Sequence, residues 1–171
     1  MGRDGSDDRL REVQRTLPRA FAHMSIMSSL GIEPEGGCHY PAEGYAQMAR
    51  LIAPLVERFN YGVQPTGSIT PPDLLRARFA TAARDAVVLE FDQPVRWDAA
   101  LASQFRLDGG KAAFSASSAD GATVTLRLAA PTAARTIGYI DGDRWSQKSI
   151  LRGENGIAAL TFSDVAIEPA E

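Results

Sequence analysis

The sequence has few cysteines, little net charge and no long apolar run, and each of these absences excludes a class of protein. Cys38 is the one cysteine among 171 residues, so an internal disulfide is excluded and the redox compartment stays open. The net charge of -3 provides no dense basic surface, which argues against a nucleic-acid partner. No apolar run approaches the ~20 residues that span a bilayer, so no membrane partner is expected. The polar, charged N-terminus lacks the apolar core of a signal peptide, and the localisation stays undetermined.

Metal and cofactor motifs are equally scarce. Asp141, Asp143 and Asp164 are interpreted as turn and strand-edge residues, because a calcium site needs several convergent oxygens. Cys38 stands beside His39, but adjacent residues on an extended loop point to opposite sides, and no further ligands cluster nearby. A small buried thiol is the expected role of Cys38. The sequence therefore predicts no metal and no cofactor.

The chain divides at a proline- and glycine-rich connector over residues 61–72. After it, short apolar runs alternate with Asp-Gly and Asn-Gly pairs, which suit tight hairpins. The predicted strands cover residues 75–79, 86–91, 105–107, 122–128, 136–140 and 157–162. Short strands at this spacing predict that residues 63–171 form an antiparallel β-sandwich able to fold independently.

The first part, residues 1–62, has a different character. Apolar residues spaced by three and four predict a helix over residues 9–17 that Pro18 stops. Residues 20–30 are interpreted as a short buried strand. A second helix is expected to begin at Pro41. Its apolar stripe consists of Tyr45, Met48, Ala49, Ile52, Leu55 and Val56.

His39 is the candidate catalytic residue of the chain. It lies on a glycine-bearing loop between the expected strand and the second helix, where α/β enzymes commonly carry their chemistry. An imidazole suits a general base because its ordinary pKa of about 6.5 lies near the working pH. The other histidine, His23, stands among apolar residues and is expected to be structural.

Several segments around and after His39 stand out as motifs. The first is residues 36–45 (GGCHYPAEGY), continued by 49–58 (ARLIAPLVER) and 61–62 (YG). The later ones are residues 89–97 (LEFDQPVRW), 105–109 (FRLDG) and 153–162 (GENGIAALTF). Together they resemble the last catalytic block and the C-terminal extension of the sialate O-acetylesterase-like carbohydrate esterases, in the SGNH or GDSL-type hydrolase superfamily. The resemblance covers nearly the whole chain from about Leu10 onward.

The resemblance implies an α+β chain. Residues 1–62 would be the end of a flavodoxin-like α/β (SGNH) layer, with the catalytic-histidine loop and the last helix. Residues 63–171 would be the antiparallel β-sandwich extension. The resembling family is often exported, although this chain shows no export signal of its own.

The resemblance also implies acyl transfer. A serine attacks the acetyl carbonyl, a histidine takes its proton, and an acid orients that histidine. Carried onto this chain, the base is His39. The family's Asp, three residues before the histidine, falls on Gly36 here. The neighbouring Glu35 is the candidate orienting acid in its place, although a shift of one residue moves a side chain by several ångströms.

A nucleophile block is not recognisable in this chain. The family's Gly-(Asp or Gln)-Ser sequence should lie far N-terminal of the histidine, yet only about 38 residues precede His39. Gly5-Ser6 sits in a charged tail with no strand before it, and Ser25, Ser28 and Ser29 are too close to the histidine block. We therefore expect the nucleophile and the oxyanion hole to be absent and the chain to be inactive alone.

Two tryptophans are candidate substrate contacts. Trp97 and Trp145 could form a platform on which a sugar ring stacks. The alternative is that both are core or edge residues of the sandwich, in line with the usual burial of large aromatic side chains.

Three functional interpretations remain open at the level of sequence. The chain is part of a carbohydrate O-acetylesterase, as half of a split enzyme or as a truncated product, and an N-terminal half would complete it to act on an acetylated carbohydrate. Alternatively, it is a non-catalytic carbohydrate-binding or accessory module. The third interpretation is an oligomerisation domain, because the N-terminal part leaves an apolar face that a partner chain or a second copy would cover.

Overall fold

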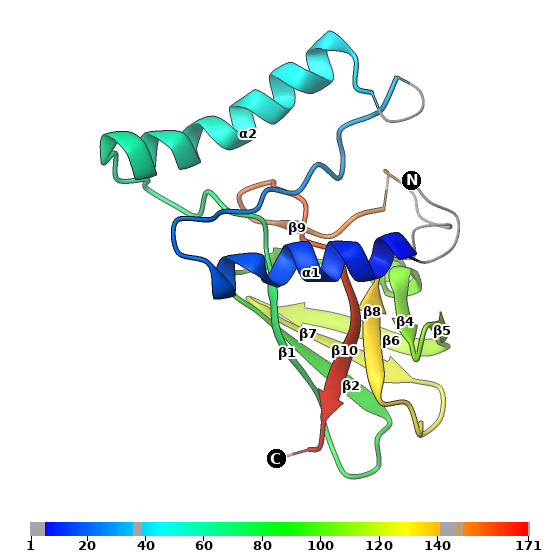
Figure 1. The fold of residues 1–171 in the computed structure, drawn as a ribbon. Helices are drawn as coiled ribbons and strands as arrows, with labels where there is room; N and C mark the ends of the chain where they lie inside the picture. Colours follow the sequence, from blue (N-terminus) through cyan, green and yellow to red (C-terminus); the bar gives the residue numbers. More distant parts are fainter. Residues whose placement is uncertain (1–5, 36–38, 141–146, 148, 171) are drawn as a thin grey trace.

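The computed structural model describes residues 6–35, 39–140, 147 and 149–170. In chain order its elements are the helices α1 (Ser6–Ala20) and α2 (Ala42–Tyr61), the strands β1 (Leu74–Phe79), β2 (Ala86–Phe91) and β3 (Val95–Arg96), the 3-10 helix η1 (Ala99–Gln104), and the strands β4 (Phe105–Leu107), β5 (Gly110–Lys111), β6 (Phe114–Asp120), β7 (Thr123–Leu128), β8 (Thr136–Tyr139), β9 (Arg152–Gly153) and β10 (Phe162–Glu168). Two helices thus precede a region of strands (Figure 1), which confirms the predicted α+β class.

The strands form one large curled sheet and one small sheet. The large sheet has the order β5-β4-β8-β10-β1-β2-β7-β6, and β3 pairs with β9. Within the described residues, β1 runs parallel to β10, with Ala77 opposite Ile167, and the other six pairings of the large sheet are antiparallel.

The prediction of a purely antiparallel sandwich is therefore wrong. A parallel pair needs a long connection, and no local turn motif announces one. A curled sheet and a sandwich both bury one face of each strand, so alternation of apolar residues does not distinguish them.

Most strands predicted after the connector coincide with observed ones, and one does not. The strand predicted over residues 122–128 is β7, in which Val124 and Leu126 are fully buried. The strand predicted over residues 157–162 is wrong for most of its length. Only Phe162 belongs to a strand, as the first residue of β10, and the residues before it are mostly buried and form one bridge, from Ala158 to Arg152. A short apolar run does not reveal whether it is strand or buried coil. Strand β6 was not predicted, since its serines and alanines gain strand structure only by pairing with β7.

The core lies on the concave side of the sheet and is rich in aromatic rings. Phe105 packs against Tyr139 with ring centroids 5.0 Å apart and against Phe162 at 6.2 Å. The Tyr139 hydroxyl accepts a hydrogen bond of 2.6 Å from the Leu151 backbone N–H. Burial raises the pKa of Tyr139, although that hydrogen bond and the charge of Arg152 act in the opposite direction. The tyrosine is therefore a neutral core residue.

Helix α1 is longer than the sequence suggests, and the strand expected after it is absent. The helix continues to Ala20, so Pro18 lies inside its last turn and does not stop it. The segment 21–30 forms turns and extended chain, and within the described residues no strand of either sheet includes it. Phe21 is 56% exposed. The apolar residues of this segment therefore never reach a sheet edge where their backbone groups could pair.

Helix α1 packs on the sheet through charged side chains. It lies across β1 and β10 (Figure 1). The Arg15 guanidinium, 4% exposed, donates to the Asp73 carboxylate at 2.5 Å, to the Leu74 carbonyl at 3.0 Å and to the Glu12 carboxylate at 2.5 Å. Glu12 in turn accepts a 3.1 Å bond from the Ser163 backbone N–H. The N-terminal segment is thus bound to strands on the far side of the connector, and the division at residues 62 and 63 stays a prediction.

Helix α2 begins one residue after the start that the sequence indicates. Pro41 is the N-cap residue, and the chain leaves the helix at Gly62 in the left-handed conformation, φ +72°. The helix lies apart from the sheet (Figure 1). No helix in the described ranges is long and apolar enough to cross a membrane.

Candidate functional site

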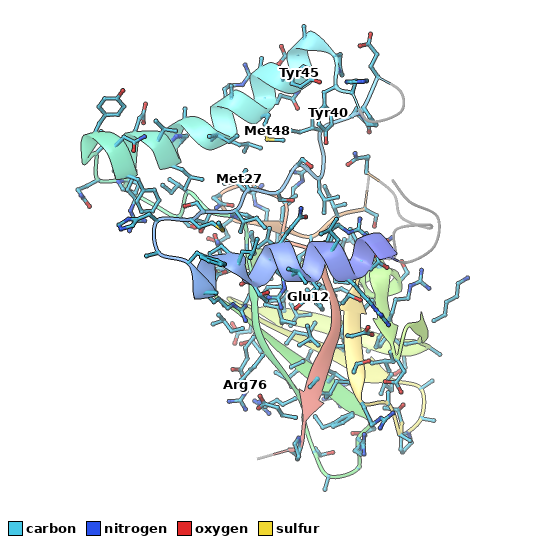
Figure 2. All side chains as sticks on the ribbon, viewed as in Figure 1. Glu12, Met27, Tyr40, Tyr45, Met48 and Arg76 are labelled. Carbon is cyan, nitrogen blue, oxygen red and sulfur yellow. The ribbon has the colours of Figure 1, made fainter. Side chains whose placement is uncertain are left out.

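His39 lies in an exposed loop immediately before α2. The loop closes on itself, because the Glu35 backbone N–H donates a 3.1 Å hydrogen bond to the His39 carbonyl. Directly after it, the Tyr40 ring meets Tyr45 edge to face, with centroids 5.9 Å apart and planes at 87° (Figure 2). The His39 carbonyl and the residue after it are thus held in place, while His39 is exposed and can receive an approaching group.

The first turn of α2 approaches the His39 loop closely at Gly44. A Cβ atom placed on Gly44 would lie 2.9 Å from the Cβ of Tyr40 and 3.1 Å from Cγ2 of Ile32. Both distances are tighter than ordinary carbon contacts, so a side chain here would push the helix away. Glycine at this position therefore lets helix, loop and the buried Ile32 pack as one unit.

Glu35 and His39 are neighbours through their backbones. Within the described residues no hydrogen bond or ion pair joins their side chains, and Glu35 is exposed. Its role as the orienting acid stays a prediction. Gly36, which takes the position of the family's Asp, and Cys38 lie outside the described residues.

The serines near the histidine block have other partners. The Ser28 side chain is buried, donates to the Ala159 carbonyl at 3.4 Å and accepts the Leu30 N–H at 3.3 Å. Among the residues described, no serine hydroxyl is hydrogen-bonded to His39. Both partners of the Ser28 hydroxyl are therefore backbone groups, and the absence of a nucleophile from this chain stays a prediction.

Of the two tryptophans in the candidate sugar platform, the structure describes only Trp97. The Trp97 indole N–H donates to the Ser117 hydroxyl at 3.3 Å, and its ring lies 5.9 Å from that of Phe105. Trp97 is partly buried against the sheet core, which fits the structural alternative. Trp145 lies outside the described residues, so stacking of a sugar on these rings stays a prediction.

Acidic residues do not gather into a metal site in the described part of the chain. No group of three or more His, Cys, Asp or Glu side chains is close enough there to hold an ion. Asp141 and Asp143 fall outside the described residues. Asp164 was expected at a turn or strand edge, but it lies within the inner strand β10, with φ +54°, where the pairing with β8 changes register.

A long apolar groove runs beside α2, and sequence analysis found only half of it. Its volume is about 590 Å³, and it separates the helix from the segment before the His39 loop. Its lining consists of His23, Ser25, Met27, Ile52, Leu55, Val56, Phe59 and Asn60. The helical periodicity indicated the α2 side. The opposite wall was missed because that segment had been interpreted as a strand.

Comparisons with known proteins bear on the fold. No protein-family model matches the chain, and no curated protein matches it. One solved structure that does match is the crystal structure of a carbohydrate acetylesterase from Xanthomonas citri, with a TM-score of 0.57 and 20% sequence identity. The match covers 77% of this chain and 30% of that one, so this chain spans under a third of the acetylesterase's length. At this identity the likeness shows a shared fold and a partial structural resemblance.

The site as described can perform one chemical task. An exposed imidazole can accept a proton from a hydroxyl placed within about 3 Å of a ring nitrogen. Nucleophilic catalysis further requires that hydroxyl and hydrogen-bond donors for the oxyanion. Among the described residues, His39 is the candidate for the base, and the apolar groove lies farther along α2, from Ile52 to Asn60.

Proposed function

We propose that this chain is the histidine-bearing C-terminal portion of a serine-type carbohydrate O-acetylesterase, whose nucleophile comes from residues beyond these 171. The observation that carries the proposal is the coincidence of three features. The fold matches under a third of a carbohydrate acetylesterase, His39 is exposed before α2, and the apolar side of α2 is uncovered. An incomplete enzyme would have these features where its missing part docks.

In the completed site, His39 acts twice as a proton carrier. It takes the proton of the serine hydroxyl as the serine oxygen attacks the acetyl carbonyl, and gives it to the sugar oxygen as the acyl bond breaks. A water molecule then attacks the acetyl-enzyme, His39 takes its proton and returns it to the serine, and acetate leaves. Glu35 is the proposed partner for the other imidazole nitrogen. A carboxylate there favours the required tautomer and stabilises the imidazolium.

The proposed partner surface is the exposed apolar side of α2 together with the groove beside it. Ile52 is 39% exposed, Val56 40% and Phe59 58%, and all three line that groove. Contiguous exposed apolar side chains of this kind mark a docking surface on a soluble protein. We assign it to the α/β portion carrying the serine block, because the matched acetylesterase is more than three times longer than the region that this chain covers.

A second candidate function is a non-catalytic carbohydrate-binding or accessory module. The observation that favours it is the origin of the sheet and its core. All the strands of the large sheet come from β1 onward, with β1 and β10 paired in its middle. The buried cluster beneath it runs from Leu74 to Ile167, so this part of the chain has a core of its own. In this alternative His39 has no catalytic role.

Hydrolysis of p-nitrophenyl acetate tests the proposal. The chain is assayed alone and after co-purification with the polypeptide encoded directly upstream, each with His39→Ala and with the control Lys111→Ala, an exposed residue of β5 outside the groove. We expect the chain alone to be no faster than His39→Ala. The completed enzyme should lose at least about 10⁴-fold in kcat on His39→Ala and little on Lys111→Ala.

Two outcomes would contradict the proposal. A chain that is active alone, and loses that activity on His39→Ala, must contain its own nucleophile, and Ser25, Ser28 and Ser29 would be replaced next. An assembled pair that binds an acetylated oligosaccharide without hydrolysing it would support the accessory function instead.

A further inference from the structure

One side chain from the strand region is hydrogen-bonded to the segment that leads into the His39 loop. The Gly31 backbone N–H donates to Oε1 of Gln147 at 2.6 Å, and Nε2 of Gln147 donates to the Ile32 carbonyl at 3.1 Å. The amide thus offers one acceptor and one donor, as a neighbouring strand would. These residues are 115 and 116 positions apart in the sequence, so the contact joins two distant parts of the chain.

The same segment is held at two further points. Ser28 donates to the Ala159 carbonyl from a buried position. Gly31 has φ +85°, and a Cβ there would overlap the Arg152 guanidinium, which itself donates to the Gly156 carbonyl at 2.9 Å. The close approach of Arg152 and the positive φ together require glycine at position 31. The Gln147 contact is therefore the centre of a built junction.

A displacement at this junction would reach His39 through close contacts. Ile32, 3% exposed, follows Gly31 directly and packs against Gly44 in the first turn of α2. Gly44 also touches Tyr40, the residue after the histidine. On the other side, the bond from the Glu35 N–H to the His39 carbonyl closes the loop. Packed contacts of this kind transmit shifts because the interior has little free volume.

We propose that Gln147 is a positioning residue for His39. The strand region of the chain, through this amide, fixes where the catalytic loop stands. An effect of Gln147 on catalysis depends on the function proposed above. The positioning of His39 by Gln147 does not depend on that function. Gln147 touches neither the imidazole nor a reacting group, so it acts through the backbone of Gly31 and Ile32.

The first experiment reads the position of His39 without any activity. The chain contains two histidines, so two sets of imidazole signals appear in an NMR spectrum, and His23→Gln assigns them. We expect Gln147→Ala to shift and broaden the His39 signals and to speed hydrogen exchange at the Gly31 amide by at least about 10-fold. Gln147→Glu keeps the acceptor for Gly31 but loses the donor to Ile32, so its effect should be intermediate.

Arg84→Ala is the control for general loosening. The Arg84 guanidinium lies in the connection between β1 and β2 and donates to the Ala134 carbonyl at 2.5 Å, and within the described residues no hydrogen bond joins it to the histidine loop. This variant should leave the His39 signals as in the wild type. Unchanged His39 signals in a folded Gln147→Ala protein, or equal changes in Arg84→Ala, would overturn the proposal.

The second experiment measures the completed enzyme. If Gln147 positions His39, Gln147→Ala should lower kcat by roughly 10- to 100-fold with little change in KM, because misplacement of a catalytic group acts on the transition state. Gln147→Glu should restore part of the loss. If the completed wild type shows no esterase activity, the proposed function fails, while the NMR result still decides whether Gln147 positions the loop.

Discussion

The large sheet and helix α2 differ in how much of their apolar side chains they bury. In the sheet, Val87, Leu89 and Leu126 are 0% exposed. In α2, apolar side chains of the same kind stand in solvent, with Ile52 39% exposed and Phe59 58% exposed. Both elements have regular apolar periodicity, so the difference lies in what covers the apolar face. The sheet curls over its own core, whereas α2 needs a surface that the described residues do not provide.

The largest effect on stability is expected from shortening a side chain in the core of the sheet. Leu126→Ala should lower the free energy of unfolding by about 2–5 kcal/mol, because it removes buried methyl groups and leaves a cavity. Urea denaturation followed by circular dichroism measures the change. Leu75→Ala is the matched control, since Leu75 is 59% exposed on β1 and should cost no more than about 0.5 kcal/mol. Similar losses for both variants would show that the sheet lacks a fixed core.

The next largest effect is expected at the contact between α1 and the sheet. Burial would lower the pKa of Arg15, but its hydrogen bonds to Glu12 and Asp73 outweigh that effect and the pKa is raised. Arg15→Ala should cost about 2 kcal/mol, below the value for a fully buried pair because both carboxylates are partly exposed. The expected result is faster hydrogen exchange along α1.

Arg19→Ala is the control for this contact. Arg19 binds the same Asp73 carboxylate at 2.8 Å, but its side chain is 49% exposed. Its loss should cost less than about 1 kcal/mol, as for other exposed ion pairs. An effect of Arg19→Ala as large as that of Arg15→Ala would mean that burial of the guanidinium does not decide how firmly α1 is held.

On α2 the same kind of change should hardly affect stability. Phe59→Ser should alter the free energy of unfolding of this chain by no more than about 0.5 kcal/mol, because the ring has little to pack against. It should, however, weaken co-purification with the α/β portion. Sedimentation at several concentrations accompanies this measurement. A wild type that dimerises with rising concentration, and a Phe59→Ser variant that does not, would assign the surface to a second copy of the chain.

The smallest expected effect is a dependence on pH at Asp108, in the turn between β4 and β5. Backbone N–H groups of Arg135 and Thr136 each donate to this carboxylate at 2.9 Å, and they lower its pKa from the ordinary value of 3.8. Its contribution to stability is therefore present above that value and is lost as the pH falls through the lower folded pKa. Asp108→Asn should lower the melting temperature at about pH 7 and have less effect near pH 3. An equal shift at both pH values would contradict this assignment.

Local motifs in the sequence predicted much of the fold and the position of the candidate base. The strand over residues 86–91 coincides with β2, and α2 begins at Ala42, one residue after the expected start at Pro41. The loop before α2 carries an exposed His39, where a base would be accessible. These features depend on neighbours in the chain, whose side-chain pattern and backbone restrictions act over a few residues.

Other features could not be predicted because they depend on contacts between distant residues. The segment 21–30 is apolar enough for a strand, but it meets no sheet edge within the described residues. Gln147 carried no motif, and only the folded chain brings its amide to Gly31. Likewise, the groove beside α2 exists only because two separate segments run along each other.

By itself, the sequence determined the positions of most helices and strands, the apolar faces of elements such as β7 and α2, and that a histidine loop precedes the second helix. The tertiary structure decided that β10 lies parallel to β1, that α1 docks through Arg15, and that the strand region holds the segment before His39 through Gln147. The physical reason is the distance along the chain over which each kind of interaction acts. Propensity and periodicity act between neighbouring residues, whereas pairing of distant strands and burial of polar contacts depend on which surfaces meet when the chain closes.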